Sequence, residues 1–170
     1  SWKSIKAKVW NGRVRPPCHL SCQVLNIYQE TWICQMKKIY SNVKKDKLLH
    51  IILRKSDVQT QRMNIIEDDQ FLQLAAMLLQ NGKTFKPHKH IYSEKTTTIA
   101  QESWVVIQGK VKAILYDLND EIIDEPILEA GDVSITLYGG HTYEILEDDT
   151  LVYEYKTGPY TGIENDKEFI

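Results

Sequence analysis

Short runs rich in β-branched and aromatic residues follow one another from Asn42 to the C-terminus. Turn sequences such as Asn81-Gly82 and Gln108-Gly109 separate these runs, and no segment after residue 57 has the apolar spacing of an amphipathic helix. Strands at roughly 8–12-residue spacing are typical of an antiparallel sandwich or barrel. The sequence therefore predicts an all-β fold with strands over 62–66, 71–79, 98–107, 111–116, 133–137, 142–146 and 150–155, and one edge strand over Leu48–Leu53.

The first 41 residues differ from the rest of the chain. All three cysteines and three of the four tryptophans lie before residue 36, and neither a helix nor a strand period persists there. Cys18 and Cys22 lack the paired short spacings of a structural zinc site. Met36 would suit a natural translation start. We therefore expect a non-native or loosely packed basic extension over 1–41 and one domain over 42–170.

Charge is divided unevenly along the chain. Residues 1–56 hold 12 cationic and 2 acidic side chains, whereas residues 57–170 hold 9 and 21. An acidic body argues against nucleic-acid binding, which needs clustered cations. No apolar run approaches the 18 or so residues of a membrane span, and the N-terminus does not resemble a secretory signal. We expect a soluble, cytoplasmic protein with neither a nucleic-acid nor a membrane partner.

The histidines carry the clearest chemical signal. His88-Lys89-His90 places two imidazoles two residues apart, so on an extended strand both rings face the same side. Neutral imidazole is a good ligand for first-row transition metals. His141 is the third histidine of the β-rich part and follows Gly139-Gly140. These three residues are candidate metal ligands; the alternative is that they are ordinary polar histidines.

Glycines and a carboxylate complete two motifs around these histidines. Gly82 precedes His88 by six residues, Glu102 precedes Gly109 by seven, and Gly131 opens the run that ends at His141. The pattern resembles the two motifs of the cupin superfamily. That resemblance implies a double-stranded β-helix, or jelly-roll barrel, in which His88, His90, Glu102 and His141 bind one divalent metal ion. The eleven residues between His90 and Glu102 are more than cupins usually have, so Gln101 or Glu94 is an alternative fourth ligand.

The C-terminal part of the sequence resembles a smaller group within the cupin superfamily. Glu154-Tyr155-Lys156-Thr157-Gly158-Pro159-Tyr160 and Gln61-Arg62-Met63-Asn64 are similar to segments of WbuC-type and related small cupins, which are associated with polysaccharide and sugar-nucleotide gene clusters. Lys156 and Tyr160 are candidate substrate contacts, or else parts of the turn that ends the last strand. Gln73 is a third candidate, because it is polar within an apolar run.

The fold alone does not fix a reaction. We expect a metal-dependent isomerase or epimerase for a small polar or carbohydrate-related ligand, with the metal acting as a Lewis acid. The alternatives are an Fe(II)-dependent dioxygenase and a non-catalytic sugar-binding or regulatory module. The ligand types suit Fe, Mn, Ni, Co or Zn equally. Because jelly-roll proteins commonly pair through edge strands, we also expect a homodimer in which Leu48–Leu53 takes part.

Overall fold

The computed structural model describes residues 35–170. The chain divides into two units, residues 1–33 and 34–170, and the description below concerns the second. Residues 1–34 of the extension predicted over 1–41, with the cysteines at 18, 22 and 34, lie outside the described residues. Of residues 35–170, 36% lie in β-strands, and all of these strands pair in antiparallel fashion. Helix among these residues is limited to two short 3₁₀ turns, Lys55–Asp57 and Ile163–Asn165. The all-β prediction is confirmed at that level.

The larger sheet has five antiparallel strands in the order β1-β2-β9-β5-β11. The strands are β1 (Lys37–Tyr40), β2 (Leu48–Leu53), β9 (Val133–Thr136), β5 (Glu102–Gln108) and β11 (Leu151–Lys156). β2 pairs with β1 on one side and β9 on the other. The predicted edge strand over Leu48–Leu53 is therefore wrong as to position: it is an interior strand with no free edge for a dimer contact. The larger sheet also contains β1, a strand that the sequence did not predict.

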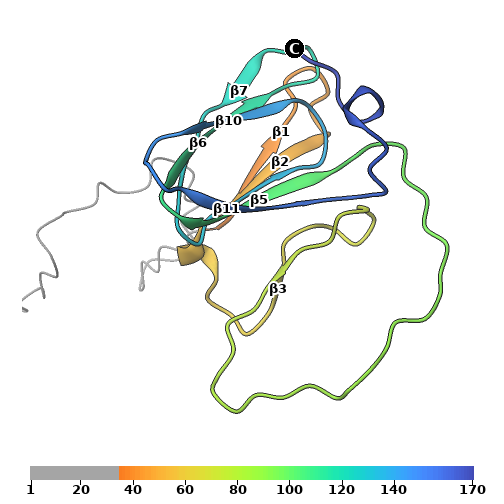
Figure 1. The fold of residues 1–170 in the computed structure, drawn as a ribbon, viewed down its shortest axis with the longest axis vertical. Helices are drawn as coiled ribbons and strands as arrows, with labels where there is room; N and C mark the ends of the chain where they lie inside the picture. Colours follow the sequence, from red (N-terminus) through yellow and green to blue (C-terminus); the bar gives the residue numbers. More distant parts are fainter. Residues whose placement is uncertain (1–34) are drawn as a thin grey trace, which may run out of the picture. The chain divides into compact units, whose positions relative to one another are not determined.

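A smaller sheet faces the first (Figure 1). It contains β10 (His141–Ile145), β6 (Lys110–Tyr116) and β7 (Ile122–Asp124), and β8 (Ile127–Glu129) also pairs with β6. A separate two-stranded ladder joins β3 (Met63–Asn64) to β4 (Ala75–Ala76). Within residues 35–170 the sheets do not close into a barrel, so the cupin jelly roll stays a prediction.

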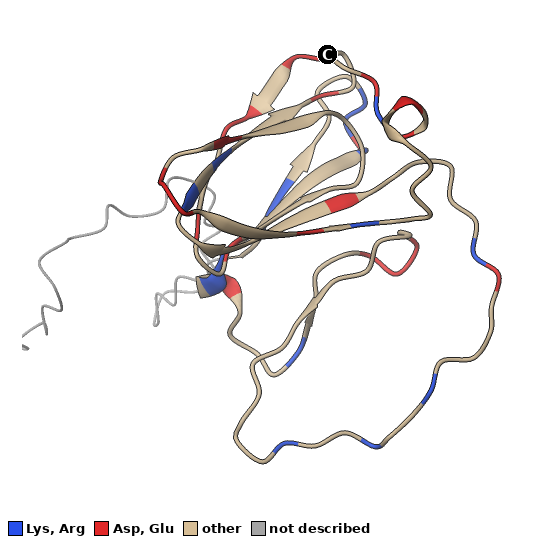
Figure 2. Cartoon of the chain, in the orientation of Figure 1, with Lys and Arg blue, Asp and Glu red and all other residues tan. Residues whose placement is uncertain are grey.

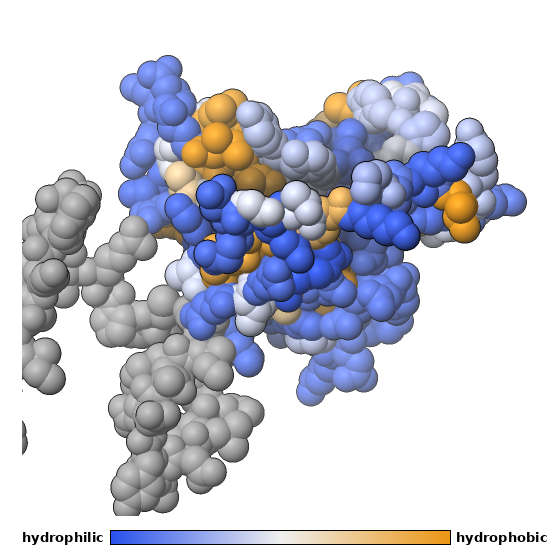
Figure 3. Space-filling model, turned by 90° about the horizontal axis from the view of Figure 1, so that it is seen from below, coloured by the Kyte–Doolittle hydropathy of each residue, from blue (hydrophilic) through white to orange (hydrophobic). Residues whose placement is uncertain are grey.

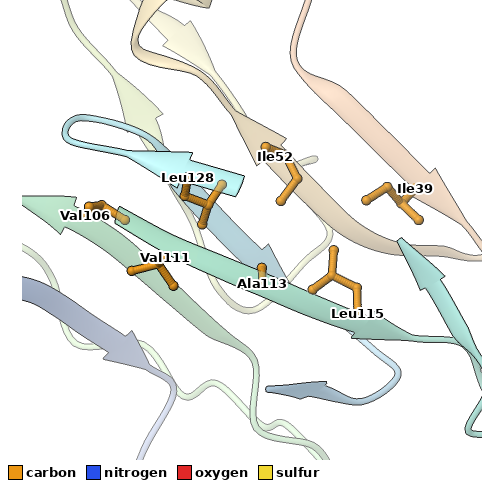
Figure 4. Packing of buried hydrophobic residues seen from close by; sticks show 7 residues of the cluster. All are labelled: Ile39, Ile52, Val106, Val111, Ala113, Leu115 and Leu128. Atoms are coloured by element: carbon orange, nitrogen blue, oxygen red, sulfur yellow. The ribbon is translucent and has the colours of Figure 1, made fainter. Parts of the chain in front are cut away.

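Two apolar clusters hold these layers together. The first lies between the sheets and joins side chains of both (Figure 4): Ile39, Ile52, Val106, Val111, Ala113, Leu115 and Leu128. On β6 the alternation of buried and half-buried residues is complete, as expected of a strand with one face on a core. The second cluster covers the opposite face of β2 and β9 with residues from the β3–β4 region, including Ile65 and Ile66. The five-stranded sheet is thus apolar on both faces at its centre.

A tight turn at Gly109 connects the two sheets. Gly109 joins β5 to β6 with a φ of +81°, and a Cβ there would lie 2.9 Å from the Cα atom of Thr150. Only glycine combines that backbone conformation with so close an approach. The chain turns at Gln108-Gly109 as the sequence predicts, but the hairpin expected there is wrong, because β5 and β6 belong to different sheets and do not pair with each other. The turn instead carries the chain from the larger sheet to the smaller one.

A long loop, residues 77–101, connects β4 to β5 and contains no strand. Figure 1 shows it leaving the sheets and returning only at β5. The structure confines the predicted strand over 71–79 to Ala75–Ala76 and begins the predicted strand over 98–107 at Glu102. Seen from the side of this loop, the surface is largely hydrophilic with separate apolar patches (Figure 3). We call this segment the β4–β5 loop.

No helix among residues 35–170 has the length and apolar character needed to cross a membrane.

Candidate functional site

One carboxylate–imidazole pair joins the two sheets. Glu102 opens β5 in the larger sheet, and His141 opens β10 in the smaller one. The Nε2 atom of His141 lies 3.0 Å from Oε1 of Glu102. Glu102 is 7% exposed, and His141 is half-buried. A carboxylate so far removed from water needs a partner, and here the partner comes from the facing sheet.

Two stacked aromatic rings, Trp104 and Tyr143, lie beside the pair. Trp104 follows Glu102 by two residues on β5, and Tyr143 follows His141 by two on β10, so each points to the same side of its strand as its predecessor. The two rings stack with centroids 3.9 Å apart and planes 13° from parallel. The indole Nε1 of Trp104 lies 3.1 Å from Oε1 of Glu102 and 3.2 Å from Oε2 of Glu154, and donates to both carboxylates.

The electrostatics favour an ionised Glu102. Burial alone would raise its pKa, but the hydrogen bond and charge of His141 and the charge of Lys167 outweigh burial and lower the pKa below its usual value. Tyr143 behaves in the opposite way, because burial raises the pKa of its phenol strongly. At neutral pH the site therefore holds a carboxylate beside a neutral phenol.

Lys156 lies directly opposite Glu102 in the β5–β11 ladder. Its Nζ atom pairs with Oδ2 of Asp166 at 3.2 Å and lies 4.1 Å from the ring centroid of Tyr160. Burial lowers the pKa of Lys156, but the hydrogen bond and charge of Asp166 outweigh it and raise the pKa. The predicted contacts Lys156 and Tyr160 are thus close to each other and one strand away from Glu102.

His88 and His90 lie elsewhere. Both are exposed on the β4–β5 loop, with ring centroids 5.6 Å apart in an edge-to-face arrangement. Nδ1 of His88 lies 3.1 Å from the carbonyl oxygen of Lys86. Within residues 35–170 no three His, Cys, Asp or Glu side chains are grouped as a metal site would require. The structure brings Glu102 and His141 together, and places His88 and His90 apart from them.

The pair and the full set of four differ in how well they fit a metal ion. Ligand atoms bound at about 2.0–2.2 Å and at right angles to each other are about 3 Å apart. The 3.0 Å between Glu102 Oε1 and His141 Nε2 is a hydrogen-bond distance that also equals this spacing, so the distance alone does not distinguish the two uses of the pair. His88 and His90 do not meet the pair in this arrangement of the loop. As placed, the four predicted residues do not form one coordination sphere.

The alternative ligands have other roles. Gln101 is 2% exposed and uses both ends of its amide: Oε1 accepts from the backbone N–H of Leu72 at 2.8 Å, and Nε2 donates to Oε1 of Gln70 at 3.0 Å. It fastens the start of β5 to the 70–72 turn. Glu94 is exposed on the β4–β5 loop.

Gln73, the third predicted contact, lines a surface cavity of about 480 Å³ together with residues 96–98. Its amide donates to the carbonyl oxygens of Glu67 and Gln70, so it closes a local turn. This cavity is lined by neither Glu102 nor His141. The structure therefore separates Gln73 from the carboxylate–imidazole pair.

The sequence does not mark Trp104, Tyr143 or Glu154 as site residues: aromatic side chains of a β-rich chain favour a packing role, and Glu154 is only part of the C-terminal resemblance. A signal was present, because Trp104 and Tyr143 repeat at period 2 after Glu102 and His141. What the sequence lacked was the ladder that places β11 next to β5 and so brings Glu154 opposite Trp104.

A second buried histidine lies nearby. His50 on β2 is fully buried; Nδ1 lies 3.1 Å from the hydroxyl oxygen of Thr136, and Nε2 lies 3.0 Å from the carbonyl oxygen of Tyr116 on β6. Burial lowers the pKa of His50 from 6.5 to about 4, although its hydrogen bond to Tyr116 opposes that shift. Both ring nitrogens are occupied, so His50 joins the sheets as a neutral group.

No protein-family model, curated protein or solved structure matches the chain.

Proposed function

We propose that the protein is a cupin-type jelly-roll protein that binds one divalent transition metal ion at Glu102 and His141 and isomerises or epimerises a small polar, carbohydrate-related ligand. The observation that supports the proposal best is the 3.0 Å contact between Glu102 and His141. Two residues 39 positions apart meet across two sheets, and they are two of the four residues that the cupin resemblance implies as ligands. The resemblance named them from the sequence; the contact comes from the fold.

The surroundings of the pair suit a polar ligand. Trp104 and Glu154 offer an indole ring and a carboxylate next to Glu102, and Lys156 supplies a cation on the adjacent strand. Aromatic rings with a few convergent polar groups are typical of small-molecule sites. The chain's own residues would bind and orient the ligand's hydroxyl groups, and the buried carboxylate would stay ionised to receive them.

A non-catalytic sugar-binding module is the second candidate. The stacked pair Trp104–Tyr143 favours it, because a flat aromatic surface beside carboxylates is suited to holding a ring with hydroxyl groups. This candidate uses the same residues and differs only in the absence of turnover.

Metal binding is the first test. The protein is dialysed separately against Mn²⁺, Fe²⁺, Co²⁺, Ni²⁺ and Zn²⁺, and bound metal is measured. We expect one ion per chain for at least one metal, and loss of that ion in Glu102→Gln and in His141→Ala. Glu154→Gln is the matched control, since it removes a carboxylate from the same indole and should leave the ion bound. If none of the five ions binds in stoichiometric amount, the proposal is wrong.

A second test separates the reaction classes. The metal-loaded protein is incubated with a panel of sugars and sugar nucleotides, and products are followed by NMR. New isomers support the proposal. Oxygen consumption that depends on Fe²⁺ would instead favour a dioxygenase, and saturable binding without products would favour the binding module.

A further inference from the structure

A surface cavity near the start of β5 plays no part in the proposed function. Its volume is about 480 Å³, and small-molecule sites range over about 300–1,000 Å³. Most of its lining comes from two segments, residues 68–73 before β4 and residues 95–101 before β5, and neither Glu102 nor His141 contributes to it. The cavity therefore offers room for a small ligand that the carboxylate–imidazole pair does not touch.

A buried amide joins the two segments. Gln101 is 2% exposed; it accepts a hydrogen bond from the backbone N–H of Leu72 and donates one to the side chain of Gln70. A side-chain amide has two N–H donors and two acceptor lone pairs, and the described bonds use one of each. Because Gln101 lines the cavity, the remaining N–H and lone pair of this buried group are suited to a polar ligand.

Both signs of charge line the cavity. Asp68 and Asp69 supply two carboxylates from one segment, and Lys95 supplies an ammonium group from the other. Figure 2 shows an acidic stretch between β3 and β4 in red and cationic positions along the β4–β5 loop in blue. Among the residues that the structure describes, neither Lys95 nor Asp68 takes part in an ion pair or a side-chain hydrogen bond. A ligand with one cationic and one anionic group would satisfy both.

A neighbouring cavity shows where the cationic group belongs. This cavity, of about 690 Å³, shares the 68–70 turn and Tyr138 with the smaller one and adds the carboxylate of Asp46. The ammonium group of Lys47 already lies 3.1 Å from the centroid of the Tyr138 ring, so this boundary between the cavities accommodates a cation. An ammonium group of a ligand gains most on the side of the smaller cavity next to the 68–70 turn.

The other segment suits a carboxylate. Three threonines, residues 96–98, follow Lys95, and all four side chains belong to the lining of the smaller cavity alone. The hydroxyl of Thr97 donates to the carbonyl oxygen of Ile99, whereas the hydroxyls of Thr96 and Thr98 have no partner in the described part of the chain. An ammonium group and free hydroxyls are hydrogen-bond donors for a carboxylate.

Apolar surface lies between these polar groups along the chain. Phe71 follows the 68–70 turn and is half-buried, and Ile99 follows the threonines and is 45% exposed. Both line the smaller cavity. Because removing apolar surface from water is favourable, an apolar group of the ligand adds to the attraction of its charges.

We infer that the smaller cavity binds a free α-amino acid with an apolar side chain. The ammonium group of the amino acid lies at the 68–70 turn, its carboxylate at Lys95 and the threonines, and its side chain against Phe71 and Ile99. This binding site is separate from the proposed function and involves no metal ion.

Three related probes test the two charges. L-leucine carries both charged groups, L-leucinamide lacks the carboxylate, and N-acetyl-L-leucine lacks the ammonium group. Binding to the full chain is measured by isothermal titration calorimetry in the presence of EDTA. We expect L-leucine to bind with a Kd below about 1 mM, and each analogue to bind at least about tenfold more weakly. No binding of L-leucine, or equal binding of L-leucine and either analogue, overturns the inference.

Variants locate the carboxylate of the ligand. Lys95→Gln should weaken binding of L-leucine by about tenfold without weakening that of L-leucinamide, which has no carboxylate. Lys89→Gln, on the same loop and outside the lining of the cavity, is the matched control and should leave both affinities unchanged. Both lysines are exposed, so both variants should fold normally. Equal weakening by the two substitutions would show a general effect of net charge and contradict the site.

The ammonium group is located in the same way. Asp68→Asn should weaken binding of L-leucine by about tenfold without weakening that of N-acetyl-L-leucine. Asp148→Asn, in an exposed turn that does not line the cavity, is the control and should have no effect. If Asp68→Asn leaves the affinity for L-leucine unchanged, the assigned orientation is wrong.

One further variant separates this inference from the proposed function. Side chains alternate along an extended chain, so Glu102 points to the opposite side from Gln101. Glu102→Gln should therefore bind L-leucine as tightly as the unchanged protein does. If this variant lost L-leucine binding, the amino acid would bind at the carboxylate–imidazole pair and the cavity assignment would be wrong. Because EDTA is present throughout, the result does not depend on whether the metal-binding test succeeds.

Discussion

Two regions of this protein hold two candidate metal ligands each, and the regions differ in burial and in strand pairing. Glu102 and His141 begin strands in facing sheets, and the residue opposite His141 in the ladder, Leu115, is completely buried. His88 and His90 lie in the β4–β5 loop, where no ladder and no core fixes them. A motif supplies chemically suitable side chains in both regions, but only the packing of one sheet on the other brings two of them together.

Removing core volume from each region gives the largest contrast. Leu115→Ala should lower the free energy of unfolding by about 4 kcal/mol, because it leaves a cavity in the cluster between the sheets. Ile91→Ala in the β4–β5 loop should change it by less than about 0.5 kcal/mol, since that side chain is exposed. Urea unfolding measures both. Equal losses would show that the loop is packed in solution.

Acid should act on the sandwich through His50. The folded protein holds the pKa of His50 at about 4, whereas the unfolded chain binds the proton near pH 6.5. The free energy of unfolding is therefore unaffected by this group above pH 6.5 and falls as the pH falls towards 4, by about 3 kcal/mol. Unfolding curves at several pH values measure this slope.

The control is His50→Gln, which removes the titrating group and should flatten that part of the profile. His88 and His90 are the contrast from the other region, because they are exposed on the loop. If His88→Ala/His90→Ala removed the slope instead, the assignment to His50 would be wrong.

Two glycines with the same φ of +81° compare the regions at the level of the backbone. Alanine at Gly109 meets both an unfavourable φ and the backbone of Thr150, so we expect a loss of about 2 kcal/mol. Alanine at Gly82, on the β4–β5 loop, meets no atom within 4 Å and should cost below about 1 kcal/mol. Thermal unfolding of the two variants measures the difference. Equal losses of stability would show that the backbone at Thr150 moves at little cost to make room for the added methyl group.

Glu102→Gln should lower the free energy of unfolding by about 1 kcal/mol, less than the core, acid and Gly109 changes above. It keeps the shape of the side chain but replaces a charge-assisted hydrogen bond to His141 with a neutral one. Glu154→Gln, on the exposed side of Trp104, should cost less than about 0.5 kcal/mol. A larger loss in Glu154→Gln than in Glu102→Gln would contradict the assignment of Glu102 as the central carboxylate.

Turns and strands that depend mainly on neighbouring residues were predicted well from the sequence. Gln108-Gly109 specifies a turn because glycine readily adopts the positive φ found there, and the alternating residues of 111–116 specify a half-buried strand. That this turn connects two sheets, and does not form a hairpin, depends on long-range pairing. The prediction of a strand over 71–79 was wrong for most of its length. Apolar residues of this run pack on the outer face of β2 and β9, and only Ala75 and Ala76 pair as a strand. Hydrophobic content indicates burial, whereas strand pairing also needs a neighbour with a free edge.

The amino-acid sequence by itself determined an all-β chain and the positions of its main turns, because turn propensity and side-chain alternation act over a few residues. Glu102 and His141 were singled out from the sequence through the resemblance to cupin motifs. Only the tertiary structure decided that β2 is interior, that Trp104 and Glu154 adjoin Glu102, and that His88 and His90 lie apart from His141. Those outcomes depend on which strands pair across 30 to 90 positions of chain, and long-range pairing is set by the balance of core packing and chain entropy over the whole domain.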